Sequence, residues 1–386
     1  MKSIIEILER SFRRIIVYPF LRILFRNQVS NLPLDLQRTD RILIFRFDRI
    51  GDMIVTTPIL RALKKQNPRV YLGIIASRLN AEIVRKNPFV DELFVLETNL
   101  FRLFRQVLAI RRQRYAVVLN FVFNRTTSPG ILANLVAPKG FKVGQGPGRY
   151  AFYFNRMVRL PRFEKHMVES LASMVEQTFG LRLAADELTY ELFIDSECAK
   201  TVDRFLSAHG LLRRSSTHTE GSRYIVFNLS AKDYERRISP DQASMLAAHL
   251  SQMMGARVVV LWAPGDTEMS DAVRGRREFS DCIPFETANQ KPLSQLASIV
   301  AGAALVLSPD TSIIHFASST QTPVMGFYTQ LQGMKEWVPY KSVHEILTAP
   351  AGKPASAIPI ELLIQRTESF VRAILKERPQ ELPGST

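Results

Sequence analysis

The part of the sequence that most constrains the fold is residues 41–58, RILIFRFDRIGDMIVTTP. Residues 41–47 form a short, largely apolar run with β-branched and aromatic side chains, which predicts a buried strand. A tight turn at Gly51 is expected next, followed by a helix over 54–66, where apolar residues recur at helical spacing. The stretch therefore predicts the first strand–turn–helix unit of an α/β protein.

Three charged residues lie where this strand is expected to end. Asp48, Arg49 and Asp52 follow the apolar run within a few positions. Open α/β sheets bind their ligands at the carboxyl ends of the strands. A charged cluster at that edge indicates a functional site rather than an ordinary solvated loop.

The rest of the chain alternates between strand and helix patterns, which predicts parallel sheets with helices on both faces. In the first half we expect further strands at 70–75, 93–96 and 115–121, and helices at 79–86, 100–112, 128–136 and 165–180. The segment 141–162, rich in Gly, Arg and aromatic residues, is predicted to be irregular, and the polar stretch 208–222 to be an exposed loop. A second alternation begins at 223, with strands at 223–229, 256–262, 304–308 and 323–327 and helices at 240–254, 266–275, 294–301, 311–319 and 358–376.

A chain of 386 residues exceeds the size at which a single hydrophobic core stops growing, so two domains are expected. The pattern divides into a helix at 1–30, Rossmann-like domains at 38–180 and 190–350, and a C-terminal helix at 356–378. The two cysteines, Cys198 and Cys282, form no metal-ligand or CxxC pattern, which is typical of a reduced cytoplasmic protein.

Positive charge is concentrated in the first part of the chain. Residues 1–175 contain 30 Lys and Arg against 12 Asp and Glu, whereas the remainder contains 21 against 24. This asymmetry predicts that the first part meets something anionic, such as nucleic acid, an anionic membrane surface or a phosphorylated glycolipid.

The first 30 residues favour a membrane surface among these partners. Apolar residues recur there at roughly helical spacing, with six basic side chains between them. The longest uncharged run, 15–21, is too short to span a bilayer, and no signal-peptide cleavage pattern follows. We expect a basic amphipathic helix, kinked at Pro19, that lies in the membrane interface. The alternative is a helix that packs on the protein's own core.

Two motifs resemble those of glycosyltransferase family 9, which contains the lipopolysaccharide heptosyltransferases. The first is the segment RFDRIGD with the following TTP, and the second is LSPDTSIIHFAS at 307–318 with TPVMGFY after it. They occur in the family's order, about 260 residues apart, and cover both halves of the chain. The resemblance implies a GT-B architecture, with an N-terminal acceptor-binding domain and a C-terminal nucleotide-sugar-binding domain facing a central cleft.

The resemblance also suggests which residue is the catalytic base. Inverting sugar transfer needs a base that takes a proton from the acceptor hydroxyl, and Asp52 matches the family's carboxylate. The alternative role of Asp52 is N-cap of the helix at 54–66. Asp48 and Arg49 are expected to support the loop or to touch the acceptor.

Donor binding is expected in the second half. Asp310 and Thr311 open a helix whose N-terminus suits a diphosphate, and His315 completes the family's donor motif, in which Ser312 replaces the usual Gly. Near 230, the family places a hydroxyl-bearing loop and a Lys that meets the phosphates. The corresponding candidates are Ser230, Lys232, Arg236 and Arg237, and Glu268 loosely matches an acidic residue near the ribose.

The resulting hypothesis is an inverting glycosyltransferase at the cytoplasmic face of the inner membrane. By the resemblance it moves heptose from an ADP-sugar to the lipopolysaccharide core or a lipid A precursor, with no nucleic-acid partner. No metal-binding motif is present in the sequence, so metal-independent transfer is expected. Two alternatives stay open: the same fold with a UDP-hexose or UDP-N-acetylhexosamine donor, and a non-catalytic membrane- or nucleic-acid-binding protein.

Overall fold

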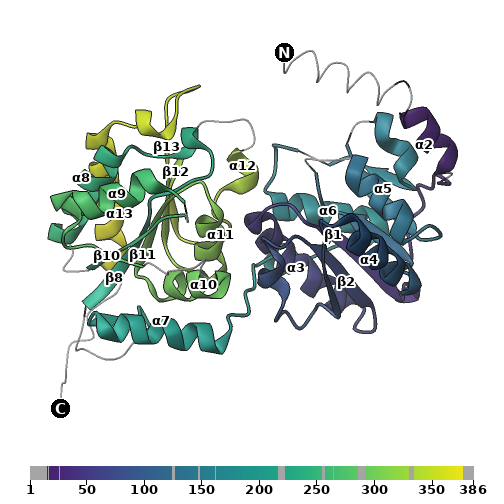
Figure 1. Ribbon diagram of the computed structural model, residues 1–386, viewed down its shortest axis with the longest axis horizontal. Coiled ribbons are helices and arrows are strands. Elements are labelled where there is room, and N and C mark those ends of the chain that lie inside the picture. Colours follow the sequence, from purple (N-terminus) through teal and green to yellow (C-terminus); the bar gives the residue numbers. More distant parts are fainter. Residues whose placement is uncertain are drawn as a thin grey trace. The chain divides into compact units, whose positions relative to one another are not determined.

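A computed structural model describes residues 15, 17–25, 27–123, 127–146, 148–160, 162–215, 222–253, 257–263, 265–285, 292–329 and 334–376. The chain divides into two compact units, shown in Figure 1. The first comprises Met1–Pro161 and Val168–Leu188, and the second comprises Arg162–Met167 and Thr189–Thr386. The chain therefore passes between the units three times.

The first unit is built on a parallel sheet of six strands in the order β3-β2-β1-β4-β5-β6. Its strands are β1 (Arg41–Arg46), β2 (Tyr71–Ala76), β3 (Glu92–Val95), β4 (Val117–Asn120), β5 (Phe141–Gln145) and β6 (Arg156–Val158). This is the strand order of a Rossmann fold. The chain adds β2 and β3 on one side of β1, and then returns to add β4, β5 and β6 on the other side. The buried, β-branched runs of the central strands explain why they lie in the middle of the sheet.

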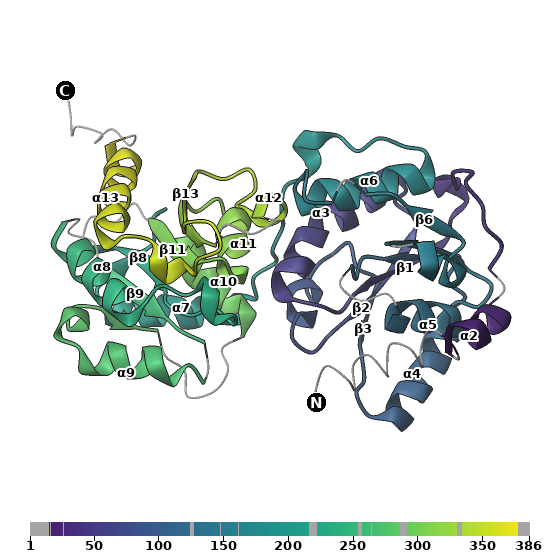
Figure 2. The same cartoon turned by 90° about the horizontal axis from the view of Figure 1, so that it is seen from above.

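Helices cover both faces of this sheet. In Figure 2, α3 (Ile50–Gln66) and α6 (Met167–Phe179) lie on one face, while α2 (Tyr18–Leu24), α4 (Leu100–Arg112) and α5 (Thr127–Val136) lie on the other. α4 and α5 share a hydrophobic core with β1, in which Ile110, Leu132 and Phe45 are buried. The predicted helix at 79–86 is instead the short 3-10 helix η3 (Ala81–Val84).

The segment 141–162 is not irregular, contrary to the prediction. It contains β5, the 3-10 helix η4 (Gly148–Tyr153) and β6. One of the glycines that suggested a loop has a packing role, because a Cβ at Gly144 would lie 2.7 Å from the ring of Phe154. Gly144 therefore lets the aromatic ring approach the strand closely.

The second unit repeats this plan. Its sheet is parallel, in the order β10-β9-β8-β11-β12-β13, with β7 beside β8. The strands are β7 (Leu211–Leu212), β8 (Ser222–Asn228), β9 (Arg257–Leu261), β10 (Ile283–Pro284), β11 (Leu305–Pro309), β12 (Val324–Tyr328) and β13 (His344–Thr348). The helices are α7 (Ser196–Ala208), α8 (Pro240–Met253), α9 (Thr267–Gly275), α10 (Leu293–Gly302), α11 (Ser312–Ser319), α12 (Met334–Trp337) and α13 (Ile360–Lys376). The predicted class, with two Rossmann-like parallel sheets, is confirmed. The prediction missed α7, α12, β10 and β13, and also β7, which lies in the stretch 208–222 that was expected to be a loop.

The N-terminal helix prediction falls partly outside the described residues, since 1–14, 16 and 26 are not among them. Within the described part, α2 begins at Tyr18 with Pro19 in its first turn. Leu21 packs against Tyr153 and Phe154, so this part of the helix contacts the protein's own core. None of the described helices combines the length and the hydropathy needed to cross a membrane.

Candidate active site

The loop between β1 and α3 places the three predicted charges of the first unit. β1 ends at Arg46 and α3 begins at Ile50, four residues before its predicted start. Gly51 therefore lies inside the helix rather than in a turn. Arg49 is the exposed N-cap residue, and Asp52 is buried in the first helical turn. The alternative role of Asp52 as N-cap is thus wrong, because Arg49 occupies the N-cap position.

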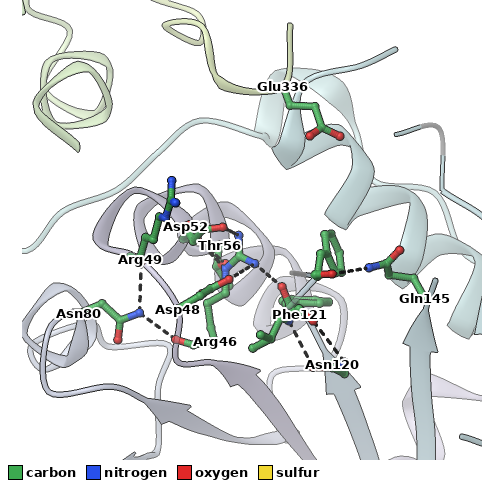
Figure 3. A network of polar contacts seen from close by, with 12 residues as sticks. Arg46, Asp48, Arg49, Asp52, Thr56, Asn80, Asn120, Phe121, Gln145 and Glu336 are labelled. Atoms are coloured by element: carbon green, nitrogen blue, oxygen red, sulfur yellow. Dashed lines mark hydrogen bonds and ion pairs between the residues drawn. The ribbon is translucent and has the colours of Figure 1, made fainter. Parts of the chain in front are cut away.

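Arg46 is the residue that organises this loop, and the sequence reasoning missed it. Its buried guanidinium places Nη2 3.0 Å from Oδ1 of Asp52 and Nη1 3.3 Å from Oδ2 of Asp48 (Figure 3). Nε donates to the main-chain oxygen of Asp52 at 2.8 Å, and Nη1 donates to that of Phe121, after β4. The available signal was a basic residue in an otherwise apolar strand, because a buried charge requires a partner.

The environment of Asp52 makes it more basic than an ordinary aspartate. Burial raises its pKa to about 6, with Asp48 adding to the rise, while the positive charges of Arg46 and Arg49 act in the opposite direction. A carboxylate with this pKa is ionised at neutral pH and accepts a proton more readily than a solvent-exposed one. That property suits a general base.

Further hydrogen bonds hold this loop in place. Asn80 is fully buried, and its Nδ2 donates to the main-chain oxygens of Arg46 at 2.9 Å and Arg49 at 3.2 Å (Figure 3). Thr56 Oγ1 donates to the main-chain oxygen of Asp52 at 2.9 Å. The backbone on both sides of the candidate base is therefore fixed.

The TTP segment of the motif has a structural explanation. Pro58 lies inside α3 and has no N–H with which to bond the carbonyl of Ile54. Thr57 Oγ1 donates to that carbonyl at 2.8 Å instead. The helix thus continues through the proline without leaving the Ile54 oxygen unsatisfied.

In the second unit, Asn228 joins the two predicted donor segments. It is the last residue of β8, and its Nδ2 donates to Ser308 Oγ at 3.0 Å, to Thr311 Oγ1 at 3.2 Å and to the main-chain oxygen of Ser230 at 3.1 Å. Thr311 caps α11, because its Oγ1 accepts from the N–H of Ile313 at 3.3 Å. The sequence reasoning missed Asn228, although a polar residue at the end of an apolar strand could have indicated it.

Both candidate phosphate-binding arginines are paired with carboxylates. Arg236 Nη1 lies 2.9 Å from Oδ2 of Asp310, and Arg237 Nη1 lies 3.2 Å from Oδ2 of Asp266. Asp266 also accepts from Ser230 Oγ at 2.5 Å and caps α9. The structure therefore brings Ser230, Arg237 and Asp266 together, and places Arg236 against Asp310.

The remaining donor candidates have different surroundings. Lys232 and Glu268 are exposed, and Glu268 lines a shallow pocket together with Arg237 and Tyr234. His315 is buried, and its ring lies edge-on to those of Tyr190 and Trp337. Burial lowers the pKa of His315 to about 3, so the ring is neutral at physiological pH and adds no positive charge to the site. Among the described residues, no cluster of three His, Cys, Asp or Glu is placed to hold a metal ion.

Comparisons with known proteins identify the family of this chain and agree with its fold. The profile of the family described as glycosyltransferase family 9 (heptosyltransferase) matches residues 102–357. The lipopolysaccharide core heptosyltransferase OpsX of Haemophilus influenzae is 21% identical over 343 residues, which are 85% of this chain and 92% of that protein.

Two solved structures have the same fold. A glycosyltransferase family 9 protein from Veillonella parvula superposes with a TM-score of 0.74 at 20% identity, covering 89% of this chain and 100% of the other. The Escherichia coli heptosyltransferase WaaC, solved with ADP, superposes with a TM-score of 0.65 at 18% identity, covering 86% of this chain and 99% of the other.

Proposed function

The chain belongs to glycosyltransferase family 9 and is a glycosyltransferase, and from this premise we propose that it transfers heptose from ADP-heptose to the lipopolysaccharide core with inversion. The name of OpsX supports the sugar and the acceptor. The ADP in the WaaC structure supports the nucleotide. Because the chain belongs to a family of glycosyltransferases, the alternative of a non-catalytic binding protein is rejected.

Asp52 is the general base in the proposed mechanism. The acceptor hydroxyl loses its proton to the Asp52 carboxylate while its oxygen bonds to the anomeric carbon of heptose. The bond from that carbon to the diphosphate oxygen breaks at the same time, and ADP leaves with the electron pair. Attack opposite the leaving group inverts the anomeric centre. The observation that supports this role is a buried carboxylate with a pKa of about 6, held by Arg46.

The second unit supplies the donor site in this proposal. Arg236 and Arg237 would exchange their carboxylate partners for the charged diphosphate, to which a guanidinium can bind in a bidentate manner. The first N–H groups of α11, beside Thr311, add a favourable dipole. In this proposal Ser230 and Lys232 are further phosphate contacts and Glu268 binds the ribose. Asp310 and the buried His315 belong to the same donor motif and support the start of α11.

Acceptor binding is assigned to the first unit. Arg49 is exposed one helical turn before Asp52, where it can attract a phosphorylated acceptor. Asp48 shares Arg46 with Asp52 and orients the loop. The excess of basic residues in 1–175 fits an anionic glycolipid and supports a location at the inner face of the inner membrane in this proposal.

We further propose that no metal ion is required, because arginines and a helix N-terminus can offset the charge of the leaving diphosphate. Turnover should therefore survive an excess of EDTA. Loss of turnover in EDTA that Mg²⁺ restores would contradict this part of the proposal.

The experiment that tests the function is transfer to a lipopolysaccharide core acceptor with ADP-, UDP- and GDP-linked sugars, with Asp52→Asn as the inactive control. ADP-heptose is expected to give the highest kcat/KM, and NMR of the product should show the inverted anomer. Preferential use of a UDP-hexose or UDP-N-acetylhexosamine would assign the enzyme to the alternative donor. Retention at the anomeric carbon would exclude direct displacement assisted by Asp52.

A further inference from the structure

One face of the first unit has an unusual composition. The helices α2, α5 and α4 cover this face of the sheet (Figure 2) and read YPFLRIL, TSPGILANLV and LFRLFRQVLAIRR. None of the three contains Asp or Glu, whereas α3 and α6 on the opposite face contain Asp52, Glu169 and Glu176. The outer surface of these three helices therefore carries no negative side chain.

The same surface exposes large apolar side chains. In α4, Leu100, Phe101 and Phe104 are 82%, 68% and 61% exposed. These residues are not needed for the core, because α4 already buries Ile110 and packs Val107 against the sheet. In α2, Phe20, Ile23 and Leu24 are 64%, 68% and 59% exposed. Large apolar side chains exposed on two helices of the same face indicate an interaction surface.

Arginines alternate with these apolar residues. Arg102 and Arg105 of α4 are exposed beside Phe101 and Phe104, and Arg22 of α2 is exposed between Leu21 and Ile23. Both helices flank α5: Tyr18 Oη lies 3.3 Å from Thr127 Oγ1, and Ile110 shares a core with Leu132. An outward face with apolar and basic residues and no acidic ones is typical of helices that lie in a membrane interface.

We propose that the outer surface of α2 and α4, here called the α2–α4 face, docks on an anionic lipid bilayer. Phe101, Phe104 and Phe20 enter the interfacial region, and Arg102 and Arg105 contact the phosphates of the headgroups. This inference rests on the membrane location in the proposed function and makes it more specific. It assigns the contact with the membrane to residues of α2 and α4, which lie outside 1–17.

Other occupants fit the α2–α4 face less well. A second copy docked through the same face would bring arginines against arginines, and these helices offer no carboxylate to pair with them. Single-stranded nucleic acid binds through stacked aromatic rings, whereas α2 and α4 expose aliphatic residues, among them Leu100, Ile23 and Leu24, as well as aromatic ones. Bilayer insertion uses both kinds of side chain together with the charge.

Vesicle sedimentation of the full chain tests whether the apolar and the basic residues of α4 contribute to membrane binding. With phosphatidylethanolamine–phosphatidylglycerol vesicles, Phe101→Ser with Phe104→Ser should weaken partitioning by about tenfold or more, because two apolar side chains no longer leave water. Arg102→Gln with Arg105→Gln should also weaken binding, and the loss should be largest at low salt.

Matched controls come from the second unit. Met245→Ser with Val343→Ser removes two apolar side chains that are also exposed, and Lys200→Gln with Arg204→Gln removes two exposed charges on α7. Both controls should bind vesicles as the wild type does. If the controls and the α4 variants lost vesicle binding equally, the proposal would be overturned. Binding would then depend on the overall polarity or charge of the protein rather than on α4.

A fluorescent probe tests insertion directly. The two tryptophans of the chain, Trp262 and Trp337, both belong to the second unit. Phe104→Trp should add a signal that shifts to the blue when vesicles are added, while Val343→Trp should not. If residue 104 shows no shift although the protein sediments with vesicles, α4 does not enter the bilayer. A shift with single-stranded DNA but not with vesicles would assign the face to nucleic acid.

Activity separates this inference from the proposed function. The α4 serine variant should transfer sugar to a delipidated, water-soluble acceptor at the wild-type rate, and Asp52→Asn should bind vesicles normally. Failure of docking would leave transfer unchanged, and failure of the proposed chemistry would leave docking unchanged.

Discussion

Arg46 and Asp52 form an ion pair, with 3.0 Å between Nη2 and Oδ1, in which neither side chain is more than 8% exposed. Since the removal of either partner would leave the other charge buried, the two residues act as one unit. Arg46 also holds the main-chain oxygen of Asp52, so it fixes both the position and the charge of the candidate base.

Replacement of Asp52 by Asn should lower kcat by about 10²-fold or more, because the amide cannot accept the proton of the acceptor hydroxyl. Donor binding should be nearly unchanged, because the assigned donor contacts belong to the second unit. Steady-state kinetics with parallel ADP titrations check both statements. Unchanged turnover would remove Asp52 from the mechanism.

The raised pKa of Asp52 predicts how activity depends on pH. Because the base must be ionised, kcat/KM should rise with pH through an apparent pKa of about 6, rather than near the ordinary aspartate value of 3.8. Asp48→Asn removes a negative neighbour and should move this acid limb to lower pH. Arg46→Gln removes the main positive neighbour and should move it to higher pH.

The pH experiment has an internal control. Arg49 lowers the same pKa less than Arg46 does, so Arg49→Gln should shift the acid limb in the same direction but by less. Thermal unfolding of each variant separates pH effects from loss of the fold. Acid limbs that coincide in all variants would show that another group titrates.

The sequence predicted β1, the charged edge after it and the order of most elements, because long apolar runs and helical periodicity are local signals. It did not predict the burial of Arg46. That burial depends on the main-chain oxygen of Phe121, 75 positions later in the chain, which no local pattern reveals. The start of α3 was missed for a related reason. Its N-cap residue is Arg49, which makes no capping hydrogen bond with its side chain, so the sequence contains no typical capping residue at this position.

The donor segments show the same limit. Asp310 and Thr311 were predicted to open a helix because the apolar pattern after them is visible in the sequence, and in the structure Thr311 is the N-cap of α11. The pairing of Arg237 with Asp266 and of Arg236 with Asp310 joins loops that follow different strands. Such pairs require the three-dimensional arrangement of the sheet.

Replacement of both Arg236 and Arg237 by Ala should weaken ADP binding by about tenfold or more, because the diphosphate loses two charge-assisted partners. Calorimetric titration with ADP measures this loss, and an exposed arginine on α7, Arg204→Ala, serves as the control. If affinity is retained, the phosphates are held elsewhere, and Lys232 is the next residue to test.

Truncation should distinguish the two parts of the N-terminal segment. Removal of residues 1–14 keeps α2 in the chain and serves as the reference. Removal of residues 1–30 deletes Leu21, which packs on Tyr153, and Asn27, whose Nδ2 donates to Asn134 Oδ1 at 2.9 Å. The longer truncation should therefore lower the melting temperature, as measured by calorimetry. Equal melting temperatures for the two truncations would contradict a structural role for α2.

Glu336 should be important for the stability of the second unit. It is 1% exposed and accepts from Arg162 Nε at 2.7 Å, from Arg162 Nη2 at 3.2 Å and from the N–H of Phe163 at 2.9 Å. Glu336→Ala should cost about 1.5–3 kcal/mol of unfolding free energy, because the hydrogen bonds to a buried carboxylate are lost. Glu197→Ala, which breaks an exposed pair with Lys200, should cost less than about 1 kcal/mol. Urea denaturation measures the unfolding free energy of both variants. Similar losses for Glu336→Ala and Glu197→Ala would contradict the prediction.

The placement of Arg162–Met167 in the second unit has a consequence for recombination between related genes. A single crossover between Leu188 and Thr189 would transfer Glu336 from one parent but keep Arg162 from the other. A chimera made in this way inherits the two ends of the Arg162–Glu336 ion pair from different ancestors. Exchange of the second unit as a working module therefore requires two further breakpoints, on either side of 162–167.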